Sequence, residues 1–180
     1  MRVSKTKIKD CYIIEYDKYF DERGHFSVPF NVDNFNNQTG LDFQIVQENE
    51  SFSKRNTIRG LHFQKPPFEQ SKLVRCIHGK VTDVIVDIRK TSDTYGEVVT
   101  VELDEHDVKS VFVPKGCAHG FSTQSSAVFQ YKVDNQYNKD SECGIIYNDP
   151  DLKIEWNVDH NPKISKKDLL LPFLKDLDIY

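Results

Sequence analysis

The chain has 180 residues with 24 basic and 28 acidic side chains, and its formal net charge at pH 7 is -4. This near balance argues against nucleic acid or an anionic membrane as a partner, while a few local cations still allow a small anionic ligand. A hydrophobic content of 38% suits one compact domain spanning residues 1–180. Neither a long apolar run nor a secretory leader pattern is visible, so we expect a soluble cytoplasmic protein.

Aromatic and β-branched residues dominate the apolar composition. Twelve Phe and eight Tyr accompany one Trp and one Met, and Val and Ile are frequent, which favours an all-β fold. The four cysteines, at positions 11, 76, 117 and 143, are scattered and form no CxxC pair. We therefore expect reduced, mostly buried thiols and neither a zinc knuckle nor a disulfide framework.

The first third of the chain reads as strands joined by turns. Residues 10–20 predict a strand, and the glycine-containing segment 21–26 breaks it. Residues 31–41 lack a strong period and carry Asn, Asp and Gly, so they are either a short helix or a loop. Residues 41–53 alternate well enough to predict another strand.

The clearest pattern lies in residues 72–90, where two apolar-rich runs flank His78-Gly79 and predict a β-hairpin. Further short runs at 98–103, 110–114, 120–123 and 127–133 predict more strands. Such a series indicates a sandwich or barrel, with the jelly roll a leading candidate. After residue 132 the chain is polar and turn-rich, and Ser165 to Asp168 has the pattern of a helix start, which predicts a short C-terminal helix packed on the barrel.

The segment VPKGCAHGF, residues 113–121, contains P-x-G-x-x-H and resembles the second half of the pattern of the cupin superfamily of jelly-roll β-barrels. In metal-binding cupins this His joins an H-x-H-x3-4-E cluster on an earlier strand. Here the first half is His62-Phe63-Gln64, with Gln64 in place of the second His, and Glu69 does not restore the set. Two histidines alone make a weak site, so we expect no metal and no other cofactor.

A more specific resemblance covers most of the chain from residue 20 onward. Six segments resemble the dTDP-4-dehydrorhamnose 3,5-epimerase family in order and spacing: IRGLHFQ (58–64), QSKLVRCIHGKVTDVIVDIRKTSDTYG (70–96), VPKGCAHGF (113–121), FQYKV (129–133), ECGIIYNDPDLKIEW (142–156) and ISKKD (164–168). The resemblance implies a metal-independent isomerase that inverts C3, C5 or both in a nucleoside-diphosphate-linked 4-keto sugar, a 6-deoxyhexose or a heptose, for bacterial surface polysaccharide.

Inverting a carbon next to a ketone requires a base, stabilisation of the enolate oxygen and an acid on the opposite face. The resemblance assigns the base to His62, its carboxylate partner to Asp168, the acid to Tyr131 and the enolate-stabilising cation to Lys72. Each position also has a structural interpretation: a satisfied barrel histidine, a buried tyrosine or a solvated strand lysine. The surrounding family segments favour the catalytic roles.

The resemblance also implies residues that bind the substrate. Arg59 matches a family arginine that contacts the diphosphate, and a bend at Gly60 would let both Arg59 and His62 face the ligand. His119 either positions the sugar or is a structural cupin histidine. The family forms homodimers in which N-terminal strands cross to the neighbour, and there the nucleotide site is completed by Arg23, Phe26, Gln47 or Asn49.

The chain departs from its family where the nucleobase is recognised. The family commonly reads R-G-x-F-x-E, but this chain has Val28 at the acidic position, and valine cannot hydrogen-bond to a base. Near residue 136, where paired tyrosines are frequent, only Tyr137 is left to stack on the base. The carrier is therefore dTDP or, as the first alternative, GDP.

Two other functional classes compete with the epimerase. One is a metal-dependent cupin isomerase or oxygenase, which Gln64 disfavours. The other is a non-catalytic sugar-binding jelly roll, in which His62, Tyr131 and Asp168 would be replaceable.

Overall fold

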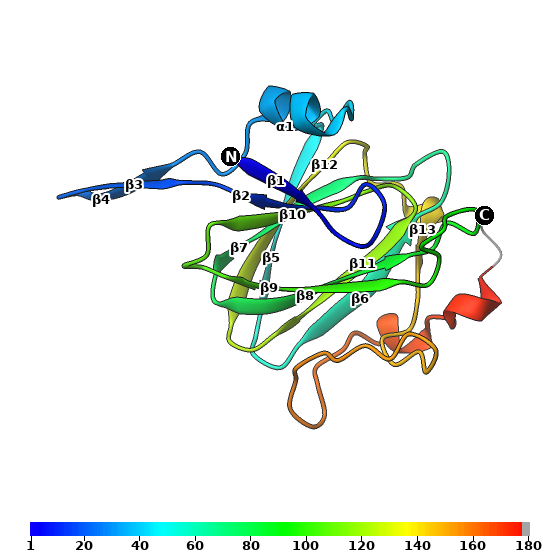
Figure 1. Cartoon of the computed structure of the whole chain (residues 1–180). Helices are drawn as coiled ribbons and strands as arrows, with labels where there is room; N and C mark the ends of the chain where they lie inside the picture. The colour runs from blue at the N-terminus through cyan, green and yellow to red at the C-terminus, as the bar shows by residue number, and fades with distance from the viewer. Residues whose placement is uncertain (178–180) are drawn as a thin grey trace.

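The computed structural model describes residues 1–177, in which two antiparallel sheets pack face to face (Figure 1). The six-stranded sheet has the order β1-β2-β10-β7-β12-β5, the five-stranded sheet has the order β13-β6-β11-β8-β9, and β3 and β4 form a separate hairpin. The all-β jelly-roll prediction is confirmed. The strands are β1 (Arg2–Lys5), β2 (Tyr12–Glu15), β3 (Lys18–Asp21), β4 (Gly24–Ser27), β5 (Gln47–Ser53), β6 (Ile58–Gln64), β7 (Lys72–His78), β8 (Lys80–Asp87), β9 (Val98–Asp104), β10 (Lys109–Val113), β11 (Cys117–Thr123), β12 (Ala127–Val133) and β13 (Glu142–Gly144).

Three apolar clusters hold the layers together. Between the sheets, side chains of β7 to β12 interdigitate, including Val74, Ile85 and Phe129. The outer face of the five-stranded sheet is covered by the C-terminal segment through Trp156 and its neighbours. The outer face of the six-stranded sheet is covered by α1 (Val32–Thr39) through Phe35 and by the following loop. Both sheets are thus shielded on their outer faces while they share one inner core.

The predicted hairpin in residues 72–90 is wrong, because β7 and β8 belong to different sheets. β7 pairs with β10 and β12, whereas β8 pairs with β9 and β11. The turn at Gly79, with φ +78°, carries the chain from one sheet to the other, and a Cβ there would lie 2.1 Å from the Ser126 carbonyl oxygen. Alternation shows which face of a strand is buried but not which strand pairs with it, so the pattern could not exclude this crossing.

The N-terminal predictions are partly confirmed. Strand 10–20 is divided into β2 and β3, an additional strand, β1, precedes them, and the strand predicted at 41–53 is limited to β5. The segment 31–41 is a helix: Asn31 caps its start, accepting a hydrogen bond from the Asn34 N–H at 2.9 Å, and Gly40 ends it in the left-handed conformation.

The short helix predicted at the C-terminus is present in 3-10 form, and Leu174 packs it on the barrel. The segment forms two short 3-10 turns, η2 (Asp168–Leu170) and η3 (Leu174–Asp176), and a third, η1 (Lys139–Ser141), precedes β13. Pro172 separates η2 from η3, and Leu171 before it is extended. A proline removes a donor and disfavours helical backbone in the residue before it, so the helical start at Ser165 could not propagate.

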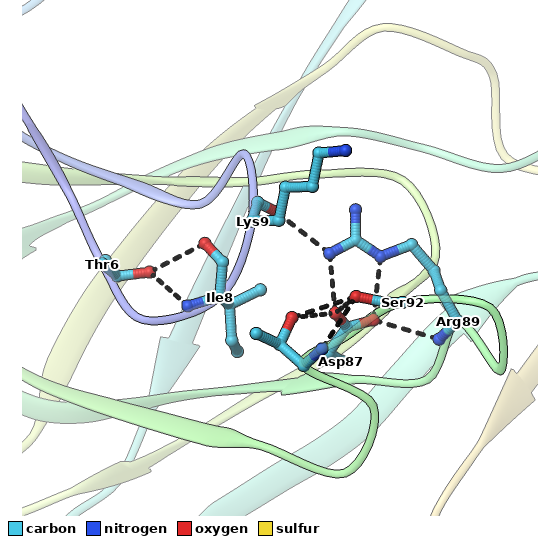
Figure 2. Close-up of polar contacts among 7 residues, drawn as sticks. Thr6, Ile8, Lys9, Asp87, Arg89 and Ser92 are labelled. Atoms are coloured by element: carbon cyan, nitrogen blue, oxygen red, sulfur yellow. Dashed lines mark hydrogen bonds and ion pairs between the residues drawn. The ribbon is translucent and has the colours of Figure 1, made fainter.

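Asp87, a fully buried carboxylate, joins the N-terminal loop to the end of β8. It accepts hydrogen bonds from the guanidinium of Arg89 and from the hydroxyls of Ser92 and Thr94, and Arg89 also donates to the Lys9 carbonyl at 3.0 Å (Figure 2). Burial opposes ionisation of Asp87, but these donors outweigh it and lower its pKa to about 2. The carboxylate is therefore a structural anchor.

The helices in residues 1–177 are all short. None of them has both the length and the apolar character needed to cross a lipid bilayer.

Candidate active site

A cavity of about 660 Å³ opens between the two sheets and is bordered on one side by the segment that precedes η2. Strands of both sheets contribute to its wall, together with residues 163–168. Nine of the eleven predicted site residues line it: Gln47, Asn49, Arg59, His62, Lys72, His119, Tyr131, Tyr137 and Asp168. The fold thus brings together residues that are more than 100 positions apart in sequence.

A β-bulge in β6 directs two of these side chains into the cavity. His62 lies opposite His119 on β11, but Arg59, three residues earlier, lies opposite Phe121, only two residues later. The extra residue on β6 reverses the alternation, so Arg59 shares the inner face with His62 while Leu61 and Phe63 face the outer cluster. This is the bend at Gly60 that the sequence left open, and Gly60 has φ +108°.

Gly60 is required by close backbone approach as well as by its conformation. A Cβ at this position would lie 2.7 Å from both the Gly120 Cα and the His119 carbonyl oxygen. We expect Gly60→Ala to lower the free energy of unfolding by about 2–5 kcal/mol, from strain and overpacking together. Urea denaturation measures this loss of stability. The control is Gly96→Ala, where φ is +79° but the space is open, and about 1 kcal/mol is expected. Equal losses would contradict the role of the close approach.

His62 and Asp168 form a hydrogen-bonded pair, with Nε2 and Oδ1 2.8 Å apart. Asp168 is buried, whereas the His62 side chain is about one-third exposed toward the cavity. Burial opposes ionisation of Asp168, but hydrogen bonds from His62 and the Gly60 N–H outweigh it and hold the pKa of Asp168 below its ordinary value. An ionised carboxylate on one ring nitrogen leaves Nδ1 as the ring atom free to take a proton from a ligand.

Tyr131 enters the cavity from β12, in the sheet opposite the one that carries His62. It lies beside Asn49 of β5 and Val74 of β7 in the ladder. Burial raises the pKa of its phenol, the positive charge of Arg59 opposes this, and the negative charge of Glu142 adds to it. The phenol therefore stays protonated at neutral pH, as an acid must.

Lys72, at the start of β7, is buried, and within residues 1–177 its Nζ makes one hydrogen bond, to the His62 carbonyl at 3.3 Å. Burial lowers the pKa of Lys72 to about 8, although the charges of Asp83 and Glu142 oppose the shift. An under-solvated ammonium that faces a cavity is well suited to stabilise a developing negative charge on a ligand.

Because Lys72 is charged at an energetic cost, Lys72→Met is expected to raise the free energy of unfolding at pH 7 by about 1–3 kcal/mol while turnover falls. Between pH 8 and 10.5 the unfolded chain binds the lysine proton and the folded chain does not. Wild-type stability therefore rises with pH in this window relative to the variant, and the advantage of Lys72→Met shrinks. Urea unfolding at pH 7 and 9.5 measures both effects.

The control is Lys80→Met, on neighbouring β8. Lys80 pairs with Glu102 at 2.8 Å, and the hydrogen bond from Lys80 to Glu102 raises the lysine pKa. No gain in stability is expected there at pH 7. A loss of stability in Lys72→Met at pH 7 would show that Lys72 is not a buried charge under strain.

Two further cavity residues are held by buried partners. His119 Nε2 lies 2.6 Å from Oδ1 of Asp83, and the imidazole stacks near Phe129. Arg59 Nε donates to the Ser53 hydroxyl at 2.8 Å, and its Nη2 donates to the Phe52 carbonyl at 3.1 Å. A guanidinium restrained in this way is pre-organised for an anionic group.

A second charged group lies at the cavity wall near β13. The Tyr137 hydroxyl donates to Glu142 at 2.7 Å, and Lys167 pairs with the same carboxylate. Burial opposes ionisation of Glu142, but these two donors lower its pKa overall, and the carboxylate in turn raises the pKa of Tyr137 and of Lys167. On β5, Gln47 donates to Asn49 at 2.6 Å, and both amides line the cavity.

The two remaining predicted residues, Arg23 and Phe26, lie outside the cavity. They belong to the β3–β4 hairpin, which projects away from the sheets (Figure 1). Arg23 pairs with Asp21 at 2.6 Å, and Phe26 is 66% exposed. His78 also lies outside: it ends β7 and pairs with Glu105 at 2.9 Å.

Gln64 is fixed by backbone groups. Its side-chain amide donates to the carbonyls of Phe68 and Gln136, and its oxygen accepts from the Asn138 N–H at 2.7 Å. Within residues 1–177 no three His, Cys, Asp or Glu side chains gather into a set that could hold a metal ion. Through its bonds to Phe68, Gln136 and Asn138, Gln64 holds together the loops beside the cavity.

Asp83, Glu142 and Lys167 were missed by the sequence analysis. Each had a visible signal. Asp83 interrupts the apolar run of β8, Glu142 begins one of the family-like segments, and Lys167 directly precedes Asp168. A charged residue inside an otherwise apolar strand is rarely buried without a partner, which is the rule that would have identified Asp83.

The chain is similar in sequence and in fold to known proteins. A curated dTDP-4-dehydrorhamnose 3,5-epimerase of Shigella flexneri is 45% identical over 170 residues, 94% of this chain and 93% of that protein. The crystal structure of the dTDP-4-dehydrorhamnose 3,5-epimerase of Elizabethkingia anophelis superposes with a TM-score of 0.95 at 44% identity, covering 100% of this chain and 99% of that one.

A second solved structure contains a bound sugar nucleotide. It is the dTDP-6-deoxy-D-glucose-3,5-epimerase of Legionella pneumophila in complex with dTDP-4-keto-L-rhamnose, with a TM-score of 0.94 at 38% identity over 98% of this chain and 94% of that one. The family model described as dTDP-4-dehydrorhamnose 3,5-epimerase matches residues 5–176. The chain therefore belongs to the dTDP-4-dehydrorhamnose 3,5-epimerase family.

Proposed function

We propose that this protein is an isomerase that inverts C3 and C5 of a dTDP-linked 4-keto-6-deoxyhexose, a step in dTDP-rhamnose biosynthesis for surface polysaccharide. The observation that carries the proposal is the pairing of His62 with Asp168 at 2.8 Å in a cavity that Tyr131 enters from the opposite sheet. Family membership and the similarity to the Legionella pneumophila complex support the choice of substrate.

The chemistry follows from the positions of these groups. His62 removes the proton from the carbon next to the ketone, and Asp168 stabilises the imidazolium that results. The electron pair moves onto the ketone oxygen to give an enolate, whose charge Lys72 stabilises. Tyr131 then delivers a proton to the other face of the carbon, which completes the inversion. Arg59 binds the diphosphate and holds the sugar between base and acid.

The deciding experiment is turnover of the dTDP-linked 4-keto sugar in heavy water. We expect deuterium at both C3 and C5 of the product, because each inversion replaces a carbon-bound proton with one from solvent-exchangeable groups. Deuterium at C3 alone would limit the reaction to one centre. If neither carbon exchanged, the epimerase would be refuted in favour of a non-catalytic sugar-binding jelly roll. Activity that depends on added iron, manganese or zinc would indicate a metal-dependent cupin instead.

The carrier is tested by titrating the protein separately with dTDP and GDP. The relatives that bind or act on dTDP sugars favour dTDP. Val28 and Tyr137 leave fewer base-specific contacts than the family pattern has, so the margin over GDP is expected to be narrow. Tighter binding of GDP would overturn the choice of carrier but would leave the roles proposed for the proton-transfer residues unchanged.

We further propose that the active form is a homodimer. Tyr19, Phe20 and Phe26 of the projecting hairpin are 63%, 76% and 66% exposed, and β5 forms an edge of its sheet next to the cavity. A second copy that receives this hairpin would cover the aromatic side chains and the open edge, and would bring Arg23 and Phe26 toward the nucleotide. Analytical ultracentrifugation is expected to give twice the chain mass, and a monomer that is fully active would contradict the proposal.

A further inference from the structure

Asp83 is a buried charged group near the cavity to which the proposed reaction gives no role. It is 0% exposed, it lies on β8, and its Oδ1 is 2.6 Å from Nε2 of His119. Its second oxygen, Oδ2, makes no hydrogen bond in the part of the chain that the structure describes. A buried carboxylate with one unpaired oxygen is costly, and such groups persist where they serve a function.

His119 is held on one side only. Its Nε2 faces Asp83, whereas its Nδ1 makes no hydrogen bond within residues 1–177. Among the described residues, the buried side-chain N and O atoms that lack a hydrogen bond are Asp83 Oδ2 and Gln124 Oε1. His119 Nδ1 lacks a hydrogen bond but is not in this set, so it is accessible to solvent. The residue lines the cavity, and the ring stacks at 17° to Phe129, which restricts its rotation. The accessible ring nitrogen is therefore fixed in direction.

The Asp83–His119 pair resembles the Asp168–His62 pair in the same cavity. Asp168 holds His62 from β6, and Asp83 holds His119 from β11, while His62 and His119 are direct partners in the β6–β11 ladder. Both imidazoles thus face the same cavity with one nitrogen occupied by a carboxylate. The charge of Asp83 also acts on Lys72, since it favours the ammonium form of this residue.

We propose that Asp83 is a positioning residue of the reaction: it holds the imidazole of His119 so that Nδ1 contacts an oxygen of the 4-keto sugar near the reacting carbons. The inference rests on the proposed epimerase function. Asp83 itself is sealed from the cavity and touches no substrate atom. A misplaced His119 costs turnover because the sugar is no longer held within reach of His62 and Tyr131.

The test is Asp83→Asn, which keeps the shape of the side chain and removes its charge. We expect kcat to fall on the order of 100-fold while the affinity for dTDP alone changes less than twofold, since no group proposed to bind the nucleotide is altered. A general loss of structure would lower both. Unchanged kcat would overturn the proposal.

A double-mutant cycle with His119→Gln separates positioning from bulk stability. If Asp83 acts only through His119, the double variant loses no more turnover than the His119→Gln variant alone. Multiplying losses would overturn the proposal. Wild-type turnover in heavy water is measured in parallel, so a failure of the epimerase function would show as absent exchange in the wild type and not as an unchanged Asp83 variant.

The matched control is Asp87→Asn, four residues further along the same strand. Asp87 is as buried as Asp83, but its partners are Arg89, Ser92 and Thr94, outside the cavity (Figure 2). We expect lower stability on urea denaturation with kcat within twofold of wild type. A fall in kcat equal to that of Asp83→Asn would assign the Asp83 effect to loss of any buried carboxylate, against the proposal.

Discussion

Replacement of His62 by alanine is expected to lower kcat by roughly 10²–10⁴-fold, the range that a positioned general base contributes. The loss should fall on kcat more than on dTDP affinity, because the proposed mechanism places His62 against the sugar and not against the nucleotide. Deuterium exchange from solvent should fall by the same factor, since the proton is no longer removed. Stopped assays of product formation and NMR of the exchanged carbons measure the two losses.

The matched control for this substitution is His78→Ala. His78 ends β7 outside the cavity, and its imidazole Nδ1 lies 2.9 Å from Oε2 of Glu105. Its replacement should leave kcat unchanged. Asp168→Asn should reproduce most of the His62 effect, because the 2.8 Å contact would no longer stabilise an imidazolium. Retention of wild-type exchange by His62→Ala would place the base elsewhere in the cavity.

Replacement of Tyr131 by phenylalanine is expected to separate exchange from inversion. Inversion should fall roughly 10²–10⁴-fold because the enolate lacks its acid. His62 still removes the proton, and its partly exposed ring can trade that proton with solvent before returning it to the same face. Unreacted substrate should therefore gain deuterium faster than product forms, a signature that the wild type does not show.

The control for the Tyr131 variant is Tyr95→Phe, at an exposed position outside the cavity, where no change in either rate is expected. Mass spectrometry of recovered substrate and product at early times gives both rates. Equal losses of exchange and inversion in Tyr131→Phe would mean that the phenol assists proton removal and would contradict its assignment as the acid.

The positions of the strands were easier to predict from the sequence than the pairing between them. β9 to β12 lie close to the apolar runs at 98–103, 110–114, 120–123 and 127–133, because alternation reports burial of one face. The same runs do not indicate which strand pairs with which. Residues 72–87 alternate equally well as a hairpin or as strands of two sheets, and only the packing of the whole barrel decides between them.

The residues of the site could be predicted from the sequence, but the contacts that hold them in place could not. The residues proposed for proton transfer could be assigned by resemblance, and the structure brings all four to one cavity. The sequence raised a bend at Gly60 but could not decide it, because a one-residue bulge leaves no trace in the sequence beyond a glycine. Asp83 could have been singled out as a charged residue in an apolar strand, but its pairing with His119 could not, because that contact exists only when β8 and β11 lie side by side.

Asp168 has a consequence for the order in which the protein acquires activity. Every strand found in residues 1–177 ends by Gly144, so both sheets and the cavity walls that they supply are encoded before the carboxylate that pairs with His62. A nascent chain that has already folded its sheets would still lack half of the base until η2 docks against β6. The same C-terminal segment covers the outer face of the five-stranded sheet through Trp156 and Leu174, so the docking that completes the base also completes this part of the core.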